Sequence, residues 1–445
     1  MTLRARAFRD PIRLVPLLFL AAIVAGTALL SLPVATADGA GAPLLTALFT
    51  ATSAVAVTGL IVVDTPTYWS MFGQATILIL FQIGGLGIMT AATLFGLMVG
   101  RGFGLRDRMA TRIERNRLTG GNASAVLRLV LGVTLAVEAV IAVVLTARFL
   151  RYDFSFGEAA WHGLFHAVSA FNNAGFSTFS NSLMGFQTDP LILGPIVLAV
   201  IIGALGFPVM EDLRENRLRT RAWSLHTKIT LAGTAILLAV GFLAHLAMEW
   251  SNPETLGPMG VGAKMLNAAV HAAMPRTAGF NSLDVGAFSS DTLMVNYVLM
   301  FIGGGSAGTA GGIKVTTFFV LIAIVMSEVL QRRDASLFGR RFGHAVERQA
   351  LTIAVLAALL VLASTTYIAS ITTLPLEDIM FETISAFATV GMSTGITAQL
   401  PPSGLLVLTA LMFVGRVGTI TAATALALNA RDRPFRYPEE NPIVG

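Results

Sequence analysis

Four short stretches of this chain resemble one another, and their spacing constrains the fold more than any other feature. The stretches are SAVAVTGL at 53–60, SAFNNAGF at 169–176, the more degenerate AMPRTAGF at 273–280, and SAFATVGM at 385–392. Their glycines lie 116, 104 and 112 residues apart, each interval close to a quarter of the 445-residue chain. Internal repeats of this kind indicate a fold built from like units. We therefore predict four quasi-equivalent loops that meet on one axis and form a pore.

The composition indicates an integral membrane protein. Hydrophobic residues make up 55% of the chain and charged residues only 12%, whereas soluble domains carry about 25% charged residues. So little charge cannot cover a surface exposed to water. Because the chain contains no cysteine, disulfides, thiolate metal sites and cysteine nucleophiles are excluded.

Eight apolar runs are long enough to cross a bilayer, which takes roughly 20 residues of helix. They lie at about 11–33, 72–100, 123–149, 189–210, 228–249, 291–331, 349–371 and 403–429. Four shorter apolar segments run directly into the glycine stretches, at about 42–55, 157–171, 261–273 and 375–388. The predicted unit is therefore helix, half-helix, glycine loop, helix. Irregular backbone at membrane depth survives only where it is buried in protein or lines water.

The first run has an alternative interpretation as a secretory signal. It follows a basic head and precedes Ala-Thr-Ala at 35–37, which is typical of a signal-peptidase site. The run is longer than a signal core, and the repeat needs a first helix. We interpret it as a membrane helix that is retained.

Lysine and arginine are concentrated before the first run and after every second run. The segments 4–13, 101–117, 214–228, 332–348 and 431–436 hold 23 of the 30 basic residues. Positively charged loops stay on the cytoplasmic side of a membrane, so both termini and the three linkers between units are predicted to be cytoplasmic. The basic linkers lack interleaved aromatic residues, and we expect no nucleic-acid partner.

The glycine loops have the chemistry of a cation filter. Glycine permits backbone angles that other residues avoid, and four loops can aim carbonyl oxygens at a common axis to replace a cation's hydration shell. The half-helices would point their partially negative ends at the same place. No ring of carboxylates is present to hold a divalent ion, so a monovalent cation is favoured. The alternative is that these glycines only allow close helix packing.

The sixth run, at 291–331, is about twice as long as a single span requires. Its middle is GGGSAGTAGGIK at 303–314, and so much glycine predicts a break and a flexible loop within the membrane. A phosphate-binding loop is the rival interpretation. No strand precedes this segment, and it lies at bilayer depth.

Intramembrane ionisable residues are functional candidates. Lys314 closes the glycine-rich loop and Arg416 lies inside the last run. A cation beside the pore would repel a permeating cation until the loop moves. Alternatively, each charge only satisfies loop carbonyls or a carboxylate.

Two carboxylates and two histidines are candidates of a second kind. Glu138 and Glu382 are expected to pair with a neighbouring helix, or else to tune cation entry. His162 and His166 are four residues apart, but a zinc-protease helix would carry Glu after the first histidine, and here it is Gly163. We predict a packed half-helix rather than a zinc site.

The pattern resembles the potassium-translocating subunits of the TrkH/KtrB/HKT superfamily over nearly the whole chain. The most specific motifs are VTGL at 57–60 with VDT at 63–65, FNNAGF at 171–176, PRTAGFN at 275–281 and TVGMS at 389–393. Eight spanning segments without an extra N-terminal pair are more similar to the KtrB type than to the TrkH type.

The resemblance implies an all-α integral membrane protein with four pseudo-fourfold M1–P–M2 repeats around one central pore. The eight transmembrane helices and four re-entrant pore helices would divide into 1–118, 119–222, 223–343 and 344–445, the last with a cytoplasmic tail. The implied K⁺ filter residues are Val57, Thr58, Gly59, Asn173, Ala174, Gly175, Thr277, Ala278, Gly279, Thr389, Val390 and Gly391. The implied gate within 303–314 and the last helix is Gly303, Gly304, Gly305, Ser306, Gly308, Gly311, Gly312, Lys314 and Arg416.

The function implied is the membrane subunit of a potassium uptake system, and not an enzyme. Some plant relatives that prefer sodium replace the first filter glycine with serine, so Gly59 favours potassium. No loop has the TVGYG of tetrameric potassium channels, which indicates looser selectivity. A sodium-selective or sodium-coupled cation transporter of the same fold is the alternative.

The resemblance also implies cofactors, partners and location. K⁺ is the transported ion, Na⁺ is an activator in the family, and no organic cofactor is expected. The partners implied are a second copy in a homodimer and a cytoplasmic ring of nucleotide-binding RCK-type (KtrA-like) subunits. The location is the lipid bilayer of a bacterial cell (plasma) membrane, crossed several times.

Two rival functions fit the residues less well. A solute symporter with broken helices usually has two inverted repeats, whereas four parallel units are predicted here. A membrane-embedded transferase would need clustered carboxylates or histidines, and the apolar runs hold too few.

Overall fold

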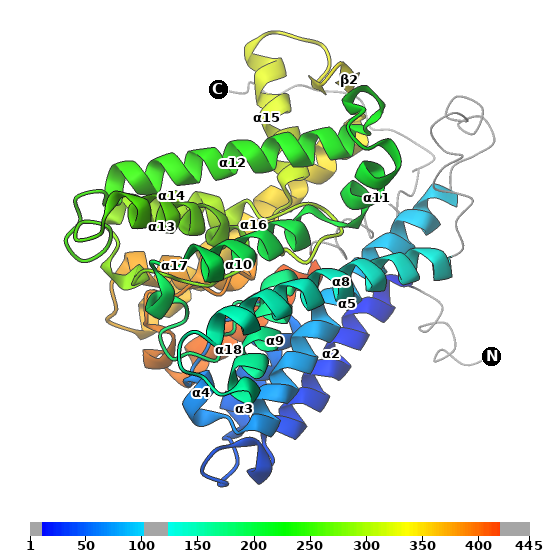
Figure 1. The fold of residues 1–445 in the computed structure, drawn as a ribbon. Coiled ribbons are helices and arrows are strands. Elements are labelled where there is room, and N and C mark those ends of the chain that lie inside the picture. Colours follow the sequence, from blue (N-terminus) through cyan, green and yellow to red (C-terminus); the bar gives the residue numbers. More distant parts are fainter. Residues whose placement is uncertain (1–10, 102–122, 419–445) are drawn as a thin grey trace.

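Helices make up nearly all regular structure in a computed structural model that describes residues 11–101 and 123–418 (Figure 1). One set of helices, called the long helices below, consists of α2 (Pro11–Leu30), α5 (Met71–Arg101), α8 (Ala123–Phe149), α10 (Pro190–Leu205), α12 (Leu225–Glu249), α14 (Ser290–Phe301), α15 (Val315–Val329), α16 (His344–Ile371) and α18 (Pro402–Phe413). Within this set α14 and α18 are only 12 residues long. Four helices of 12 to 17 residues, called the short helices below, lead directly into the glycine stretches: α3 (Leu44–Val55), α9 (Phe156–Asn172), α13 (Val261–Ala273) and α17 (Leu376–Ala388). The mostly helical class predicted from the sequence is confirmed.

The remaining elements are short. They are α4 (Thr65–Tyr68), α11 (Phe207–Asn216), the 3₁₀ turns η1 (Pro33–Ala35), η2 (Met184–Phe186), η3 (Thr220–Ala222), η4 (Met274–Arg276), η5 (Val285–Ala287) and η6 (Thr397–Gln399), and the π turn η7 (Val414–Gly418). One antiparallel hairpin joins α15 to α16 and consists of β1 (Ser336–Leu337) and β2 (Arg340–Arg341).

Several helices begin at a serine whose side chain caps them. Ser155 and Glu158 form a reciprocal capping box at the start of α9, and Ser224 and Ser289 cap α12 and α14. Each cap satisfies a backbone N–H that has no partner within the helix. The caps determine the first residue of each of these helices, which the apolar periodicity alone does not define.

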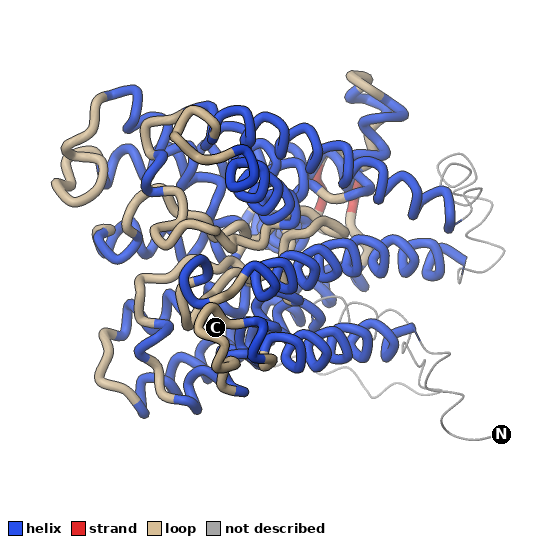
Figure 2. Tube along the Cα trace, turned by 60° about the horizontal axis from the view of Figure 1, so that its bottom comes forward, coloured by secondary structure: helices blue, strands red, loops and turns tan. Residues whose placement is uncertain are grey.

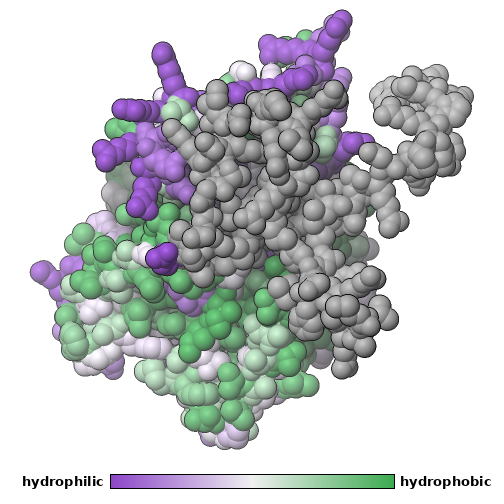
Figure 3. Space-filling model, turned by 90° about the vertical axis from the view of Figure 1, so that its right-hand side faces the viewer, coloured by the Kyte–Doolittle hydropathy of each residue, from purple (hydrophilic) through white to green (hydrophobic). Residues whose placement is uncertain are grey.

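The described residues include three helices long and apolar enough to span a bilayer, at 128–149, 225–249 and 344–371. A fourth span is reached if the bent pair of α10 and α11 counts as one. Large apolar side chains on these helices face outward, such as Val143, Leu243 and Leu362 at 69%, 63% and 64% exposure. Figure 3 shows one face with a broad hydrophobic area below a hydrophilic rim. So much exposed apolar surface requires lipid around it, and the chain is a multi-pass membrane protein.

The fourth apolar run is not one straight helix, contrary to our prediction for 189–210. Helix α10 ends at Leu205, and α11 leaves it at an angle of 93°. Gly206 stands between them at φ +89, and a methyl group at its Cα would meet the Ser306 carbonyl closer than 3.0 Å. The bend therefore makes room for the loop that follows α14.

The break predicted in the sixth run is confirmed. Helix α14 ends at Phe301 and α15 begins at Val315. The two ends of the intervening loop pair with each other: the Gly303 N–H donates to the Ile313 carbonyl at 2.8 Å, and the Val315 N–H donates to the Gly304 carbonyl at 3.1 Å. Residues 302–314, called the intramembrane loop below, thus form a closed stem with a loop at its end.

The helices pack in one pattern that recurs around the molecule. We call one long helix, the short helix and glycine stretch after it, and the next long helix a quarter. The first long helix of each quarter contacts its own short helix: α2 with α3, α8 with α9, α12 with α13 and α16 with α17. The second long helix contacts the short helix of the next quarter: α5 with α9, α10 with α13, α14 with α17, and finally α18 with α3. The contacts form a closed cycle, and Figure 2 shows stretches of loop running among the helices rather than only at their ends.

Candidate functional site

The short helices bring the glycine stretches together at the centre of this cycle. All four become fully buried toward their C-terminal ends, at 51–55, 165–172, 270–273 and 381–388. Their C-terminal carbonyls carry partial negative charge, and each helix leads into one glycine stretch. Residues 57–59, 173–175, 277–279 and 389–391 are called segments 1 to 4 below.

The four segments touch one another in a ring. Gly59, Gly175, Gly279 and Gly391 all have positive φ, at +95, +70, +69 and +89. A methyl group on each would come closer than 3.0 Å to a carbonyl oxygen of the next segment. The oxygens belong, in order, to Ala174, Ala278, Val390 and Thr58. The segments therefore meet, as predicted, and only glycine fits where one backbone crosses the next.

The residue two before each glycine also has positive φ. The values are 56° for Val57, 59° for Asn173, 121° for Thr277 and 51° for Thr389. Such angles are costly for a β-branched residue and persist only where the surroundings enforce them. The residue types do not predict this conformation for Val57, Thr277 or Thr389. Segments 1, 2 and 4 share nearly the same angle, whereas Thr277 of segment 3 departs from it.

A serine six residues before the glycine holds three of the segments. The Ser53 and Ser385 hydroxyls accept from the N–H groups of Gly59 at 3.0 Å and Gly391 at 3.1 Å, and the Ser169 hydroxyl donates to the Phe176 carbonyl at 2.8 Å. Segment 3 has Ala273 at this position and lacks the clamp.

Segments 2 and 3 are also joined by side chains. The Asn173 amide lies 2.9 Å from Thr277 Oγ1, and this contact holds for either orientation of the amide. Both side chains are fully buried.

The intramembrane loop lies against the segments and against α10. Thr309 Oγ1 donates to the Phe171 carbonyl at 3.2 Å, and the Gly305 N–H donates to the Ala204 carbonyl at 2.8 Å. A methyl group on Gly311 would meet Thr389 Oγ1 closer than 3.0 Å. The predicted gate glycines are buried, so the loop fills space beside segments 2 and 4.

Both predicted basic residues contact this loop. Arg416, on the π turn after α18, is 1% exposed, and its guanidinium donates to the Thr309 carbonyl. The Lys314 ammonium donates to the Ala310 carbonyl. No ion pair to either charge is found among the described residues. Each charge therefore faces loop carbonyls rather than a carboxylate.

The two buried carboxylates behave differently. Glu138 accepts from Gln82 Nε2 at 3.2 Å and Asn172 Nδ2 at 3.1 Å, which joins α8 to α5 and α9 as predicted. For Glu382 the predicted pairing with a neighbouring helix is wrong, and the alternative role in cation entry stays a prediction. It accepts from Ser393 and from Thr397 at 2.9 Å, in the stretch following its own short helix. The chain turns back over α17 after segment 4 and satisfies the carboxylate locally.

The histidine pair belongs to a packed half-helix, as predicted. His162 Nδ1 lies 2.6 Å from Thr178 Oγ1, and His166 Nε2 lies 3.0 Å from Ser177 Oγ. No group of three or more His, Asp or Glu side chains in the described part of the chain could hold a metal ion.

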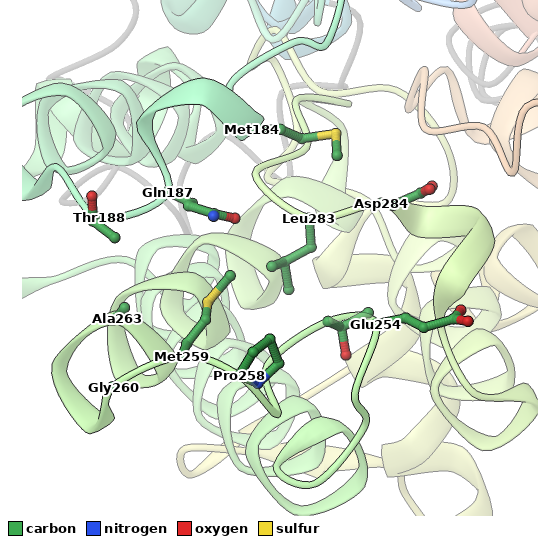
Figure 4. A pocket seen from close by; sticks show the side chains of 11 residues that line it. Met184, Gln187, Thr188, Glu254, Pro258, Met259, Gly260, Ala263, Leu283 and Asp284 are labelled. Carbon is green, nitrogen blue, oxygen red and sulfur yellow. The ribbon is translucent and has the colours of Figure 1, made fainter.

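A pocket of about 410 Å³ opens away from these segments. It lies between the stretch after segment 2, with Met184 and Gln187, and the stretch around Glu254 and Leu283. Figure 4 shows that Met184, Leu283 and Met259 project into it. It contains none of the predicted filter or gate residues.

The contacts of Thr309 and Arg276 were not predicted from the sequence. Thr309 lies among the glycines of the loop, and only the structure shows that its hydroxyl reaches a short helix. Arg276 is 5% exposed behind segment 3. A charged residue inside a predicted filter motif was the signal that could have identified it.

Comparison with known proteins agrees with this architecture. The family model described as TrkH, cation transport protein, matches residues 5–436. Ktr system potassium uptake protein B of Bacillus subtilis is 39% identical over 430 residues, covering 96% of this chain and 95% of that protein. The protein of the same name from Vibrio alginolyticus is 36% identical over 436 residues, covering 97% and 94%.

Two further matches extend the comparison. Potassium/sodium uptake protein NtpJ of Enterococcus hirae is 34% identical over 451 residues, covering 100% of this chain and 99% of that protein. The crystal structure of the potassium transporter TrkH from Vibrio parahaemolyticus superposes with a TM-score of 0.72 at 19% identity, covering 93% of this chain and 84% of that one. The chain belongs to the TrkH family of cation transport proteins, which are membrane transporters and not enzymes.

Proposed function

We propose that this chain is the membrane subunit of a potassium uptake system and conducts K⁺ through a filter built from backbone carbonyls. The filter consists of segments 1 to 4, that is Val57, Thr58, Gly59, Asn173, Ala174, Gly175, Thr277, Ala278, Gly279, Thr389, Val390 and Gly391. The observation that carries the proposal is the closed ring in which each segment glycine packs on a carbonyl of the next segment. Rings of carbonyl oxygens can replace the hydration shell of K⁺.

Under this proposal the fold is four M1–P–M2 repeats around one pore, divided at 1–118, 119–222, 223–343 and 344–445. The residues beyond 418 and between 102 and 122 lie outside the described residues, so the first boundary and the extent of the last repeat rest on the sequence. Both termini are cytoplasmic and the segments open toward the outside, because the basic residues cluster on one side of the apolar runs.

The intramembrane loop is the proposed gate. Its residues Gly303, Gly304, Gly305, Ser306, Gly308, Gly311 and Gly312 allow the backbone to rearrange, and Lys314 and Arg416 place positive charge against it. With the loop in place, these charges repel a cation that leaves the filter. Movement of the loop carries the Lys314 ammonium away from the path and separates the Thr309 carbonyl from Arg416, which lies on the turn after α18.

The relatives support the choice of ion. Two of them are named as potassium uptake proteins of Ktr systems. We infer by analogy a homodimer in a bacterial plasma membrane, seated on a cytoplasmic RCK-type (KtrA-like) ring, with Na⁺ as an activator and without an organic cofactor.

The test is growth of a potassium-uptake-deficient bacterium at low K⁺ with this chain and a cognate ring subunit, together with K⁺ flux into proteoliposomes. We expect growth and K⁺ flux well above that of empty vesicles. Failure of both, with the protein present in the membrane, would overturn the proposal.

A sodium-selective or sodium-coupled transporter of the same fold is the second candidate. The observation that favours it is the 34% identity to a relative named as a potassium/sodium uptake protein. Flux measured with Na⁺ as the only alkali cation distinguishes the two, since the first candidate conducts K⁺ faster.

A further inference from the structure

Segment 3 is held differently from the other three. Where segments 1, 2 and 4 have a clamping serine, this segment has Ala273, which offers no hydroxyl. Instead, the Met274 carbonyl accepts from the Ala278 N–H at 3.0 Å. Segment 3 therefore needs another contact to fix its path.

The third quarter also lacks a helix contact that the others share. In quarters 1, 2 and 4 a glycine on the second long helix, or on the turn directly after it, packs so closely that an added Cβ would come within 3.0 Å of the carbonyl oxygen four residues before the segment glycine. These pairs are Gly84 with Val55, Gly203 with Phe171 and Gly415 with Phe387. At the equivalent place in quarter 3, helix α14 has already ended, and the intramembrane loop occupies the position.

Arg276 occupies the space behind segment 3. Its side chain is buried, and Nη2 lies 3.4 Å from Thr234 Oγ1 on α12 and 3.5 Å from the Gly303 carbonyl. Nε has no partner, and no ion pair to Arg276 occurs within the described ranges. A buried cation without a counter-ion depends on each oxygen it can reach. The position of Arg276 and that of the Gly303 carbonyl are therefore linked.

Gly303 donates the first hydrogen bond of the loop stem, and it also lies beside Thr277 of segment 3. A methyl group on Gly303 would lie 3.4 Å from Thr277 Cγ2 and would also meet the Gly311 carbonyl. The start of the loop thus contacts Arg276 and lies next to Thr277, whose hydroxyl already reaches Asn173 of segment 2. One chain of contacts runs from the loop stem through Arg276 to two segments of the ring.

We propose that Arg276 is a positioning residue that couples segment 3 of the filter to the stem of the intramembrane loop. When the loop moves, the Gly303 carbonyl moves, and the guanidinium shifts the backbone at Thr277. The inference rests on the proposed function, because it assigns the loop to gating and the segment to ion binding. Loop position and ion selectivity must then change together when Arg276 is altered.

The experiment measures both quantities in one protein. The chain contains no cysteine, so Ser306→Cys in the loop provides a single site for a membrane-impermeant maleimide added to proteoliposomes from the cytoplasmic side. In this background the variants are Arg276→Met, Arg276→Lys and, as a control for the loss of one positive charge, Arg151→Met at an exposed position. The readouts are the labelling rate and the ratio of K⁺ to Na⁺ flux.

For Arg276→Met we expect a flux ratio lower by about five-fold, the lower range of measured couplings between sites, and a labelling rate changed by about three-fold. Arg276→Lys keeps the charge and should lie between the parent and Arg276→Met in both readouts, while Arg151→Met should match the parent. A change in only one readout, or in neither, overturns the coupling. If Arg276→Met does not fold, the labelling rate and the flux ratio are compared between Arg276→Lys and the parent. A change in both supports the coupling, and a change in one or in neither overturns it.

Failure of the proposed function gives a different result. The chain without substitutions would then show no K⁺ flux. If it conducts K⁺ and the Arg276 variants leave labelling and selectivity unchanged, only the coupling is wrong.

Discussion

A side chain at any of the four segment glycines would occupy space already filled by the neighbouring segment's carbonyl oxygen. The same geometry strains the residues two positions earlier. Val57, Thr277 and Thr389 hold a positive φ that β-branched residues avoid. Few substitutions are therefore expected to be tolerated at these positions of the ring. The strain is distributed over all four segments rather than stored at one.

Gly59→Ser is expected to reduce K⁺ flux at least tenfold and to lower K⁺ selectivity. The new Cβ would meet the Ala174 carbonyl, and positive φ alone costs a side chain about 1–2 kcal/mol. The measurement is K⁺ and Na⁺ flux into proteoliposomes. Gly194→Ala is the matched control, since an added methyl group there meets nothing within 4 Å. Equal K⁺ flux in both variants would contradict the filter assignment.

Asp189, which caps α10 outside the spanning segments, should give the protein an acid-sensitive contact. Burial alone would raise the pKa of Asp189, but bonds from Arg148, Tyr152 and the Leu191 N–H outweigh it and hold the pKa below the ordinary value of 3.8. The carboxylate is then more acidic in the folded protein than in the unfolded chain. Its stabilisation is complete above pH 3.8 and is lost as the pH falls through the lower, folded value.

Thermal unfolding in detergent between pH 3 and pH 7 measures this effect. Asp189→Asn should lower the melting temperature near pH 7 and reduce the loss of stability on acidification. If the acid dependence of the Asp189→Asn protein equals that of the parent protein, the contact does not contribute in this way.

At the scale of elements, the molecule departs from regular helices in two places that face each other. The bend between α10 and α11 at Gly206 and the loop between α14 and α15 fit together, because Gly206 leaves room for the Ser306 carbonyl. Arg416 then fastens the loop from the side of α18 through Thr309. Three of the four quarters thus contribute to the position of one loop.

Arg416→Ala should increase K⁺ flux measured without a cytoplasmic partner. A hydrogen bond from a charged group contributes about 1.5 kcal/mol, and losing it from the closed loop should raise flux roughly tenfold. Proteoliposome flux is the measurement, with Arg333→Ala at an exposed site as the control. Unchanged flux kinetics in a folded Arg416→Ala protein would remove this residue from the gate.

The sequence predicted those elements whose pattern lies within one short stretch of the chain. Apolar length predicted α3, α9, α13 and α17, and clustered glycine predicted the break after Phe301. The bend at Gly206 was missed because a single glycine in an apolar run has the same appearance as Gly203, which only packs closely. The partners of Glu382 were missed because they depend on how the chain folds back after segment 4. Conformations imposed by neighbours, such as that of Val57, have no local signal.

At the scale of the whole molecule, the order of contacts follows the order of the chain and then closes on itself. Helix α18 returns to α3, and Gly391 packs on Thr58. Figure 1 shows the two halves that this arrangement joins, with α12, α13 and α14 on one side and α2, α5 and α8 on the other. The two halves meet in the ring at two contacts, where Gly175 packs on Ala278 and Gly391 packs on Thr58.

The proposed membrane orientation can be tested with reporter fusions. Green fluorescent protein fused after Gly445 should fluoresce and alkaline phosphatase at the same place should be inactive, because both termini are proposed to be cytoplasmic. Alkaline phosphatase inserted in the exposed turn at Asp153 should be active. The reverse pattern of activities would invert the proposed topology.

The contact between the first and last quarters has a consequence for biosynthesis. Thr58 emerges from the ribosome more than three hundred residues before Gly391, the glycine that packs on its carbonyl. Until the C-terminal quarter is inserted, the nascent protein holds three of the four segments, and the ring stays open on one side. Under the proposed function, a translation product that stops early therefore cannot complete the ion path.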